Sequence, residues 1–263
     1  MNVPLTKICT LASGSSGNAL LASCGETHIL IDAGISVRRI NTALKEHGLS
    51  LESISALLIT HSHSDHVNAL KTFLKHYTCP IYSSYGTAFD LRNRFGGIAP
   101  LLHPFAAGDT FSVGEFLIRS FPTSHDAGDS VCYRLDSCNG SVGILTDTGY
   151  VTEEAARALD GVSMLVLESN HDVETLQSGA YPYYLKQRIL GSAGHLSNDD
   201  AARFAVTAAE SGAKDVLLAH LSSENNTPAM ALNTVRRALD AHGHTSVSLA
   251  VAPRSESSPI HTL

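Results

Sequence analysis

Short apolar runs, each followed by a polar loop, recur along this chain. The run at 54–59 is continuous, aliphatic and without helical periodicity, so it predicts a buried β-strand. Stretches with apolar residues at helical spacing, such as 35–47, predict surface helices. The expected strands are 6–12, 19–23, 28–31, 54–59, 81–83, 110–113, 116–121, 131–135, 141–146, 164–167 and 215–219. The expected helices are 35–47, 67–76, 87–95, 181–190 and 199–211, with one more that starts after an N-cap at Thr152.

The order of these elements predicts an α/β fold with two sheets. The first three strands indicate an antiparallel meander, and the strands between 110 and 146 can form a second sheet against the first. A chain of 263 residues with 43% hydrophobic content can bury one large core or two small ones. No Pro/Gly/Ser-rich linker divides it, so we expect a single domain over residues 1–263.

The strand at 54–59 leads into residues 60–66, which read THSHSDH. His61 and His63 are two positions apart in an extended segment, so their side chains can point the same way, and Asp65 and His66 fall where a helix begins. A turn has no need of three imidazoles, because His gains little from turn geometry. These side chains suit zinc, iron or manganese and exceed what one ion takes from one segment, so they predict a site for two ions.

A pair of ions needs more ligands, and these should also lie at strand ends. His125 follows the strand at 116–121, Asp147 follows the one at 141–146, and His220 follows the one at 215–219. Each time an apolar strand is followed by a ligand-type residue and then by a loop. We expect these three side chains to complete the metal site.

The THSHSDH stretch resembles the signature of the metallo-β-lactamase-fold hydrolases, and His125, Asp147 and His220 follow in that superfamily's order. The IDAG sequence at 31–34 resembles its first motif, in which Asp32 supports the histidine loop. Further motifs narrow the resemblance to the YycJ/WalJ family, described as bacterial exonucleases that degrade duplex DNA from the 5′ end. These motifs are SGSSGNA at 13–19, SHDA at 124–127, LESNHD at 167–172, GHLSN at 194–198 and HLSSENNTP at 220–228.

The resemblance implies a four-layer αββα sandwich, with two mixed sheets face to face and helices outside. Because two cations lower the pKa of a bound water, we expect a hydroxide bridging them as the nucleophile. Asp65 could orient that hydroxide or accept a proton, and His195 could protonate the departing 3′ oxygen. The ligand division that the resemblance implies is His61, His63 and His125 for one ion, Asp65, His66 and His220 for the other, and Asp147 bridging both.

Two loops are candidates for substrate binding. The glycines at 13–18 let backbone N–H groups converge, so Ser15, Ser16 and Asn18 could hold a phosphate, although composition alone favours a flexible hairpin turn. Ser197 and Asn198 could donate to substrate in the same way, with a helix N-cap as the alternative.

Two further histidines have open roles. His171 could line the cleft or orient a metal ligand through a hydrogen bond. His195 lies beside flexible glycines and could be a general acid, a phosphate donor or an ordinary loop residue.

Composition limits these hypotheses. The formal net charge of −7 gives no broad footprint for nucleic acid, which counts against a nuclease. The five cysteines are odd in number and form no CxxC pair, so we expect neither a disulfide framework nor a thiolate zinc site. Residues 1–7 lack the features of a signal peptide and no apolar run is long enough to span a membrane, so we expect a cytoplasmic protein. The nearest approach to a basic patch is Lys71, Lys75, Arg92 and Arg94, each of which is also explained as a solvated helix position.

We therefore expect a metal-dependent 5′-to-3′ exonuclease on duplex DNA, with two divalent ions, manganese first and zinc or iron as alternatives. An RNA-processing or cyclic phosphodiesterase is the first alternative, because the same ions serve any phosphodiester and nothing in the sequence reads a 2′-hydroxyl. A non-catalytic binding or flavin-linked redox module is disfavoured by the full ligand set and by the lack of a flavin domain after His220. The oligomeric state is not indicated.

Overall fold

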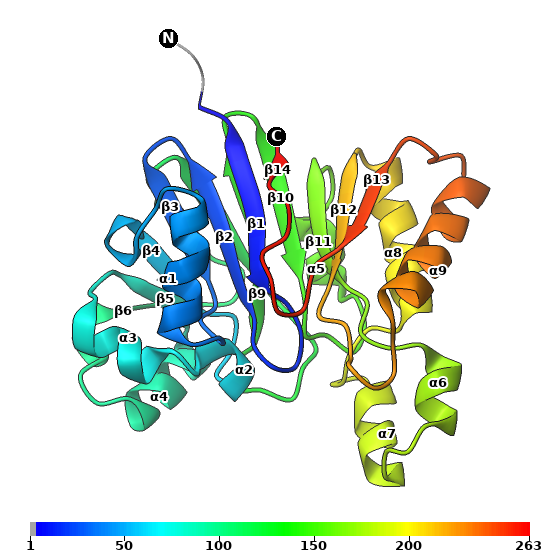
Figure 1. Cartoon of the computed structure of the whole chain (residues 1–263), viewed down its shortest axis with the longest axis horizontal. Coiled ribbons are helices and arrows are strands. Elements are labelled where there is room, and N and C mark those ends of the chain that lie inside the picture. Colours follow the sequence, from blue (N-terminus) through cyan, green and yellow to red (C-terminus); the bar gives the residue numbers. More distant parts are fainter. Residues whose placement is uncertain (1–3) are drawn as a thin grey trace.

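Two β-sheets face each other at the centre of the molecule, with helices on their outer faces (Figure 1). The computed structural model describes residues 4–263, so residues 1–3 of the stretch used for the signal-peptide prediction lie outside the described residues. Each sheet has seven strands within that range. The layers run helix, sheet, sheet, helix, which confirms the αββα sandwich.

The first sheet begins as the expected meander and continues as parallel strands. Sequence reasoning missed β6 and β14. The first contains Pro104 and lies at one edge of the sheet, and the second has two residues, so neither has a recognisable apolar run. In spatial order the strands are β14 (His261–Thr262), β1 (Thr6–Ala12), β2 (Ala19–Cys24), β3 (Thr27–Ile31), β4 (Ala56–Leu58), β5 (Ile81–Ser84) and β6 (Leu102–Phe105).

The second sheet is antiparallel in its first half and parallel in its second. Its last strand, β13, was also not predicted, because it is an edge strand without a fully buried face. In spatial order the strands are β13 (Ser248–Val251), β12 (Asp215–Ala219), β11 (Met164–Glu168), β10 (Gly140–Leu145), β9 (Val131–Ser137), β8 (Phe116–Pro122) and β7 (Thr110–Val113).

Helices cover both sheets, and two short ones project from the lower edge in Figure 1. Within residues 4–263 no helix combines the length and apolar character needed to cross a membrane. On the first sheet lie α1 (Val37–Glu46), α2 (Ser64–Val67), α3 (Leu70–His76) and α4 (Tyr85–Arg94), with 3₁₀ turns at Leu51–Ser53 and Ala99–Leu101. On the second lie α5 (Glu153–Ala158), α8 (Asn198–Glu210) and α9 (Pro228–Ala241), and the projecting pair is α6 (Val173–Ser178) and α7 (Tyr183–Leu190).

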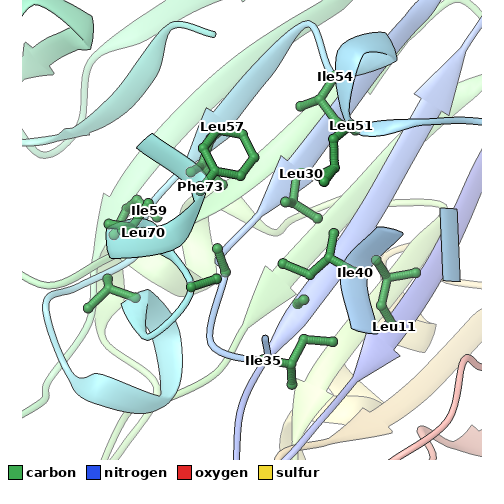
Figure 2. Close-up of a cluster of buried hydrophobic side chains, with 14 of the residues drawn as sticks. Leu11, Leu30, Ile35, Ile40, Leu51, Ile54, Leu57, Ile59, Leu70 and Phe73 are labelled. Atoms are coloured by element: carbon green, nitrogen blue, oxygen red, sulfur yellow. The ribbon is translucent and has the colours of Figure 1, made fainter. Parts of the chain in front are cut away.

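Each sheet is buried on both faces. One apolar cluster fills the space between the sheets, and another lies between each sheet and its helices. Figure 2 shows the outer cluster of the first sheet, in which Leu30 and Leu57 from the strands meet Ile40 of α1 and Phe73 of α3. Burial on both faces explains why the central strands read as continuous apolar runs.

Four of the five cysteines contribute to these cores as small residues. Cys9, Cys24, Cys79 and Cys132 are buried, Cys138 is exposed, and all five are free thiols.

Candidate metal centre

The strands that carry ligand-type residues all end at one edge of the molecule. Asp32 follows β3, Asp147 follows β10 and His220 follows β12, and α2 lies at this edge beside the first sheet (Figure 1). All three residues have a positive φ, of 59°, 55° and 55°. Non-glycine residues adopt this left-handed conformation at a cost, and such strain gathers at functional sites. The backbone thus turns sharply where each strand presents its side chain.

One cluster of possible ligands consists of His61, His63 and His125, whose nitrogen atoms lie within 4.8 Å of one another. His125 Nε2 is 3.2 Å from His63 Nδ1. The other ring nitrogen of His125 donates to the Gly194 carbonyl at 3.2 Å, which leaves Nε2 with a free lone pair. This cluster is open to solvent on the side of His63.

A second cluster consists of Asp65, His66 and His220, again with possible ligand atoms within 4.8 Å. Asp65 Oδ2 is 3.5 Å from His66 Nε2 and 3.8 Å from His220 Nε2. Both histidines are almost fully buried, and Asp65 lies in the first turn of α2. The structure therefore brings together residues separated by about 150 positions in the chain.

Asp147 lies between the two clusters and is 3% exposed. Its Oδ2 is 3.4 Å from His66 Nε2, and its Oδ1 is 3.9 Å from His125 Nε2. One carboxylate thus faces a histidine of each cluster, which is the arrangement that a bridging ligand requires.

Asp32 holds the histidine loop from behind. Its carboxylate accepts hydrogen bonds from His66 Nδ1 at 2.7 Å, from the Thr60 amide at 2.9 Å and from the Thr60 hydroxyl at 2.9 Å. Because the Thr60 hydroxyl donates to Asp32, its oxygen accepts from His61 Nδ1, 3.0 Å away, and His61 Nε2 is left free. One buried carboxylate therefore fixes the orientation of two histidines.

Gly34 allows the chain after β3 to pass close to the backbone of Asp65 and Asn18. A Cβ atom at this position would lie 1.6 Å from the Asp65 carbonyl oxygen and 2.7 Å from the Asn18 amide nitrogen. No side chain fits there, which explains the glycine that follows Asp32 and Ala33.

Glu168 is a site residue to which the sequence analysis gave no role. It ends β11 and is fully buried. Its Oε1 accepts from His195 Nδ1 and from His220 Nδ1, both at 2.8 Å, and its Oε2 accepts from the amide of Thr148 at 3.0 Å. The signal was present, because Glu168 follows an apolar strand just as Asp147 and His220 do.

The prediction that His171 orients a metal ligand through a hydrogen bond is wrong. His171 is buried, and neither ring nitrogen has a hydrogen-bond partner among residues 4–263. Burial lowers its pKa to about 4, so the ring is neutral. The orienting role belongs to Glu168, because β11 ends there and residue 171 already lies beyond the site, where it pairs with Ser197 in a backbone bridge.

The prediction that Ser197 and Asn198 contact substrate is also corrected. Ser197 is the N-cap of α8, accepting from the Asp200 amide and donating to its carboxylate. Asn198 is 2% exposed, and its side chain bonds to Ser169 and Asn226. Both side chains are committed to the protein interior, so the N-cap alternative describes this loop.

The other predicted substrate residues lie closer to the clusters. Ser15 and Ser16 are exposed at the tip of a turn closed by a 2.9 Å hydrogen bond from the Gly17 amide to the Gly14 carbonyl. Asn18 faces inward instead, with Nδ2 at 3.0 Å from His66 Nε2 and 3.4 Å from Asp65 Oδ2. Its contacts are therefore with possible metal ligands.

A small cavity of about 240 Å³ opens beside the clusters. His125 and His195 line it from the second sheet, and Ser15 lines it from the turn before β2. On the far wall Arg188 of α7 pairs with Asp126 at 2.6 Å, and Asp126 Oδ1 is 3.5 Å from His125 Nε2. Within residues 4–263 the groups of possible metal ligands lie beside this small cavity and none of them lines the larger hollows, so the chemistry belongs to this cavity.

The residues present fit divalent metal ions. His61 Nε2, Asp147 Oδ2 and His220 Nε2 are buried and make no hydrogen bond within the described part of the chain. Leaving a buried polar atom unpaired costs about 1–3 kcal/mol, so such atoms in one place indicate an ion that pairs with all of them. The donors are imidazoles and carboxylates without thiolate, which suits zinc, iron or manganese.

Without metal, protons balance the carboxylates of the site. Burial lowers the pKa of His220, but Asp147, Asp65 and Glu168 outweigh burial and raise it to about 10. The pKa of His66 is likewise raised despite burial, chiefly by Asp147 and Asp32. Burial raises the pKa of Asp147, and the surrounding histidines outweigh this and lower it well below its ordinary value. Two imidazolium groups therefore take the place of the cations.

Metal binding should consequently stabilise the protein more as pH rises. His66 and His220 have a pKa above the ordinary 6.5, so their contribution to metal-free stability is complete below pH 6.5 and is lost as pH rises through the folded values. A bound ion must displace both protons. The free-energy cost of removing each proton falls by about 1.4 kcal/mol for every unit by which pH rises. We expect the Tm difference between metal-loaded and chelator-treated protein to widen by at least about 5 °C from pH 6.5 to 8.5. A constant or narrowing difference in calorimetry would contradict this proton balance.

Comparison with known proteins agrees with this geometry. The family described as "Beta-lactamase superfamily domain" matches residues 27–221. The chain is 36% identical to "Exodeoxyribonuclease YycJ" of Bacillus anthracis over 89% of each chain. It is 38% identical to "Exodeoxyribonuclease WalJ" of Streptococcus pneumoniae serotype 2 over 87% of this chain and 86% of that one.

A solved structure shows the same fold at lower identity. The metallo-β-lactamase fold protein YhfI from Bacillus subtilis superposes with a TM-score of 0.74 at 17% identity, covering 98% of this chain and all of the other. Since the superfamily domain spans most of the chain and the two relatives exceed 30% identity over most of their length, this chain belongs to the YycJ/WalJ family of metallo-β-lactamase-fold hydrolases.

Proposed function

We propose that this protein is a metal-dependent exodeoxyribonuclease that degrades duplex DNA from its 5′ end. The observation that carries the proposal is the pair of ligand clusters joined by Asp147, in a chain 36–38% identical to two proteins named exodeoxyribonucleases. The 5′ direction and the duplex preference come from the family resemblance.

The proposed ligands fall into two sets that share one residue. Two divalent ions held there would lower the pKa of water toward neutrality and polarise a phosphoryl oxygen, which is the chemistry that phosphodiester hydrolysis needs. Asp65 is at the open side of its cluster, where its carboxylate can also orient water or accept a proton. The sets are His61, His63 and His125 for one ion, Asp65, His66 and His220 for the other, and Asp147 for both.

His195 is the proposed group that protonates the departing 3′ oxygen. Its Nδ1 donates to Glu168, which leaves Nε2 free in a ring that lines the cavity. Burial lowers the pKa of His195, but the Glu168 carboxylate outweighs burial and raises it above the ordinary value. A histidine whose pKa is raised and whose ring is held by a carboxylate has the properties of a general acid.

The turn at residues 14–17 supports recognition of a terminal phosphate. Ser15 and Ser16 present hydroxyls at its exposed tip, and Ser15 lines the cavity. A Cβ atom on Gly14 would lie 3.4 Å from Arg254 Cγ, and Arg254 donates to the Ser222 carbonyl at 3.0 Å, so its guanidinium lies at the same rim. Hydroxyl donors and a nearby cation suit a phosphate.

A 5′-phosphorylated duplex should therefore be degraded faster than the same duplex with a 5′-hydroxyl. Ser15→Ala/Ser16→Ala should reduce this advantage several-fold, because it removes two donors without touching a proposed metal ligand. The measurement is kcat/KM on the two duplexes. Asn18→Ala is a poor choice, since Asn18 contacts His66 and Asp65. Equal kcat/KM of the unmodified protein on the 5′-phosphorylated and 5′-hydroxyl duplexes would refute recognition of the terminal phosphate. It would leave the metal chemistry intact.

The proposal as a whole is tested with a substrate panel. Labelled at either the 5′ or the 3′ end, DNA duplexes, single strands and RNA are incubated with manganese, zinc or iron. The expected result is early release of the 5′ label from duplex DNA, and none from a closed circle. Preference for RNA, or release of the 3′ label first, would instead favour the RNA-processing alternative or the opposite direction.

A further inference from the structure

A hollow of about 540 Å³ between α3 and α4 gathers cations from both helices. Lys71 and Lys75 come from α3 and Arg94 comes from the end of α4, and no acidic side chain lines the hollow. Among its other lining residues is Phe95, whose ring lies under the Arg94 guanidinium at 5.3 Å. In a chain with a net charge of −7, this basic hollow is an exception.

These cations have no anionic partner. No ion pair within residues 4–263 involves Lys71, Lys75 or Arg94. Five other arginines are each paired with a carboxylate, namely Arg134, Arg157, Arg188, Arg203 and Arg236. The hollow therefore has positive charge to offer to a ligand.

Local helix energetics do not explain the position of Lys71. It lies in the first turn of α3, where the helix dipole disfavours a cation, whereas Lys75 in the last turn is favoured. Lys71 and Lys75 are also four residues apart, so two like charges lie on the same face and repel each other. An anion in the hollow would offset both penalties.

The basic hollow lies directly beside the candidate metal centre. Arg94 Nη1 donates to the Ser62 carbonyl at 3.0 Å, and Ser62 lies between His61 and His63. Asn68, which also lines the hollow, is the C-cap of α2, the helix that carries Asp65 and His66. Figure 1 shows α2, α3 and α4 together along the lower edge of the first sheet.

We infer that the basic hollow binds backbone phosphates of the DNA duplex whose 5′ end lies at the metal centre. The inference rests on the proposed function. It gives a chain with a net charge of −7 a local electrostatic contact for nucleic acid. Each phosphate neutralised by a cation releases counterions. For binding through the hollow, the logarithm of the binding constant therefore falls linearly with the logarithm of the salt concentration.

The test is the salt dependence of duplex binding by the metal-loaded protein. Its ligand is a fluorescent hairpin duplex with phosphorothioate linkages at the 5′ end, and affinity is measured by anisotropy between 50 and roughly 250 mM salt. Lys71→Gln/Lys75→Gln leaves the Arg94 contact with Ser62 intact. Lys45→Gln/Lys214→Gln is the matched control, because it removes the same charge from exposed positions elsewhere.

Two lost phosphate contacts reduce the magnitude of the salt slope by about 1.8, and affinity near 100 mM salt falls at least about tenfold. The control keeps the slope of the unmodified protein. An unchanged slope in Lys71→Gln/Lys75→Gln, or an equal change in the control, overturns the inference even if the enzyme cleaves DNA. Loss of slope in a protein that binds the duplex but hydrolyses no DNA supports the basic hollow and refutes the proposed activity.

Discussion

Asp147→Asn is expected to reduce DNA hydrolysis by at least about 10³-fold and to lower the content of both metal ions. The Asp147 carboxylate is buried, and its oxygens lie 3.4 Å from His66 and 3.9 Å from His125. A neutral amide keeps the shape but cannot balance the charge of two dications. Activity on duplex DNA and elemental analysis of the purified variant measure both effects.

His125→Ala is the comparison for this variant. His125 belongs to one cluster, so its loss should empty mainly that site and leave close to one equivalent of metal. Two full equivalents in Asp147→Asn would refute the bridging role.

The second large effect is expected from His195→Ala, which should retain both metals and lose about 10²–10⁴ in rate. His195 lies in the cavity and is held by Glu168, but it belongs to neither proposed ligand set. Since a general acid must be protonated, the variant should also lose the fall in rate on the alkaline side of the pH profile. Metal content, kcat and the pH profile are measured together.

Glu168→Gln separates the two roles of its carboxylate. Glu168 holds His220 as well as His195, so this variant should lose metal affinity in addition to rate.

Near-normal turnover by His195→Ala at saturating metal would make His195 an ordinary loop residue.

Most of the fold could be predicted because its central strands are buried on both faces. The stretches 56–59 and 216–219, which belong to the runs of β4 and β12, are apolar without interruption, and their ends mark the edge where the site forms. The αββα arrangement itself came from the family resemblance, since strand order has no signature in local sequence. Of the four edge strands, β7 was predicted, and β6, β13 and β14 were missed because short length or partial exposure removes the apolar pattern.

Helix α9 could have been predicted but was not. Thr227 caps it by accepting from the Met230 amide, and Pro228 occupies the first helical position. A capping hydroxyl followed by proline is a typical helix start. The stretch had been interpreted as part of a family motif, and its secondary structure was left unassigned.

The candidate site, like the fold, could be predicted in part from local sequence. A ligand-type residue after an apolar strand was enough to select His125, Asp147 and His220. The burial of Asn198 and His171 could not be foreseen, because it depends on whether a loop turns toward the cavity or into the protein interior.

The most direct test of the account is a metal titration of chelator-treated protein against the rate of 5′-label release from duplex DNA. Two ions sharing Asp147 predict that the rate rises to its maximum at two equivalents of manganese, zinc or iron per chain. A maximum at one equivalent would contradict the dinuclear centre, and hydrolysis that needs no metal would contradict the proposed function itself.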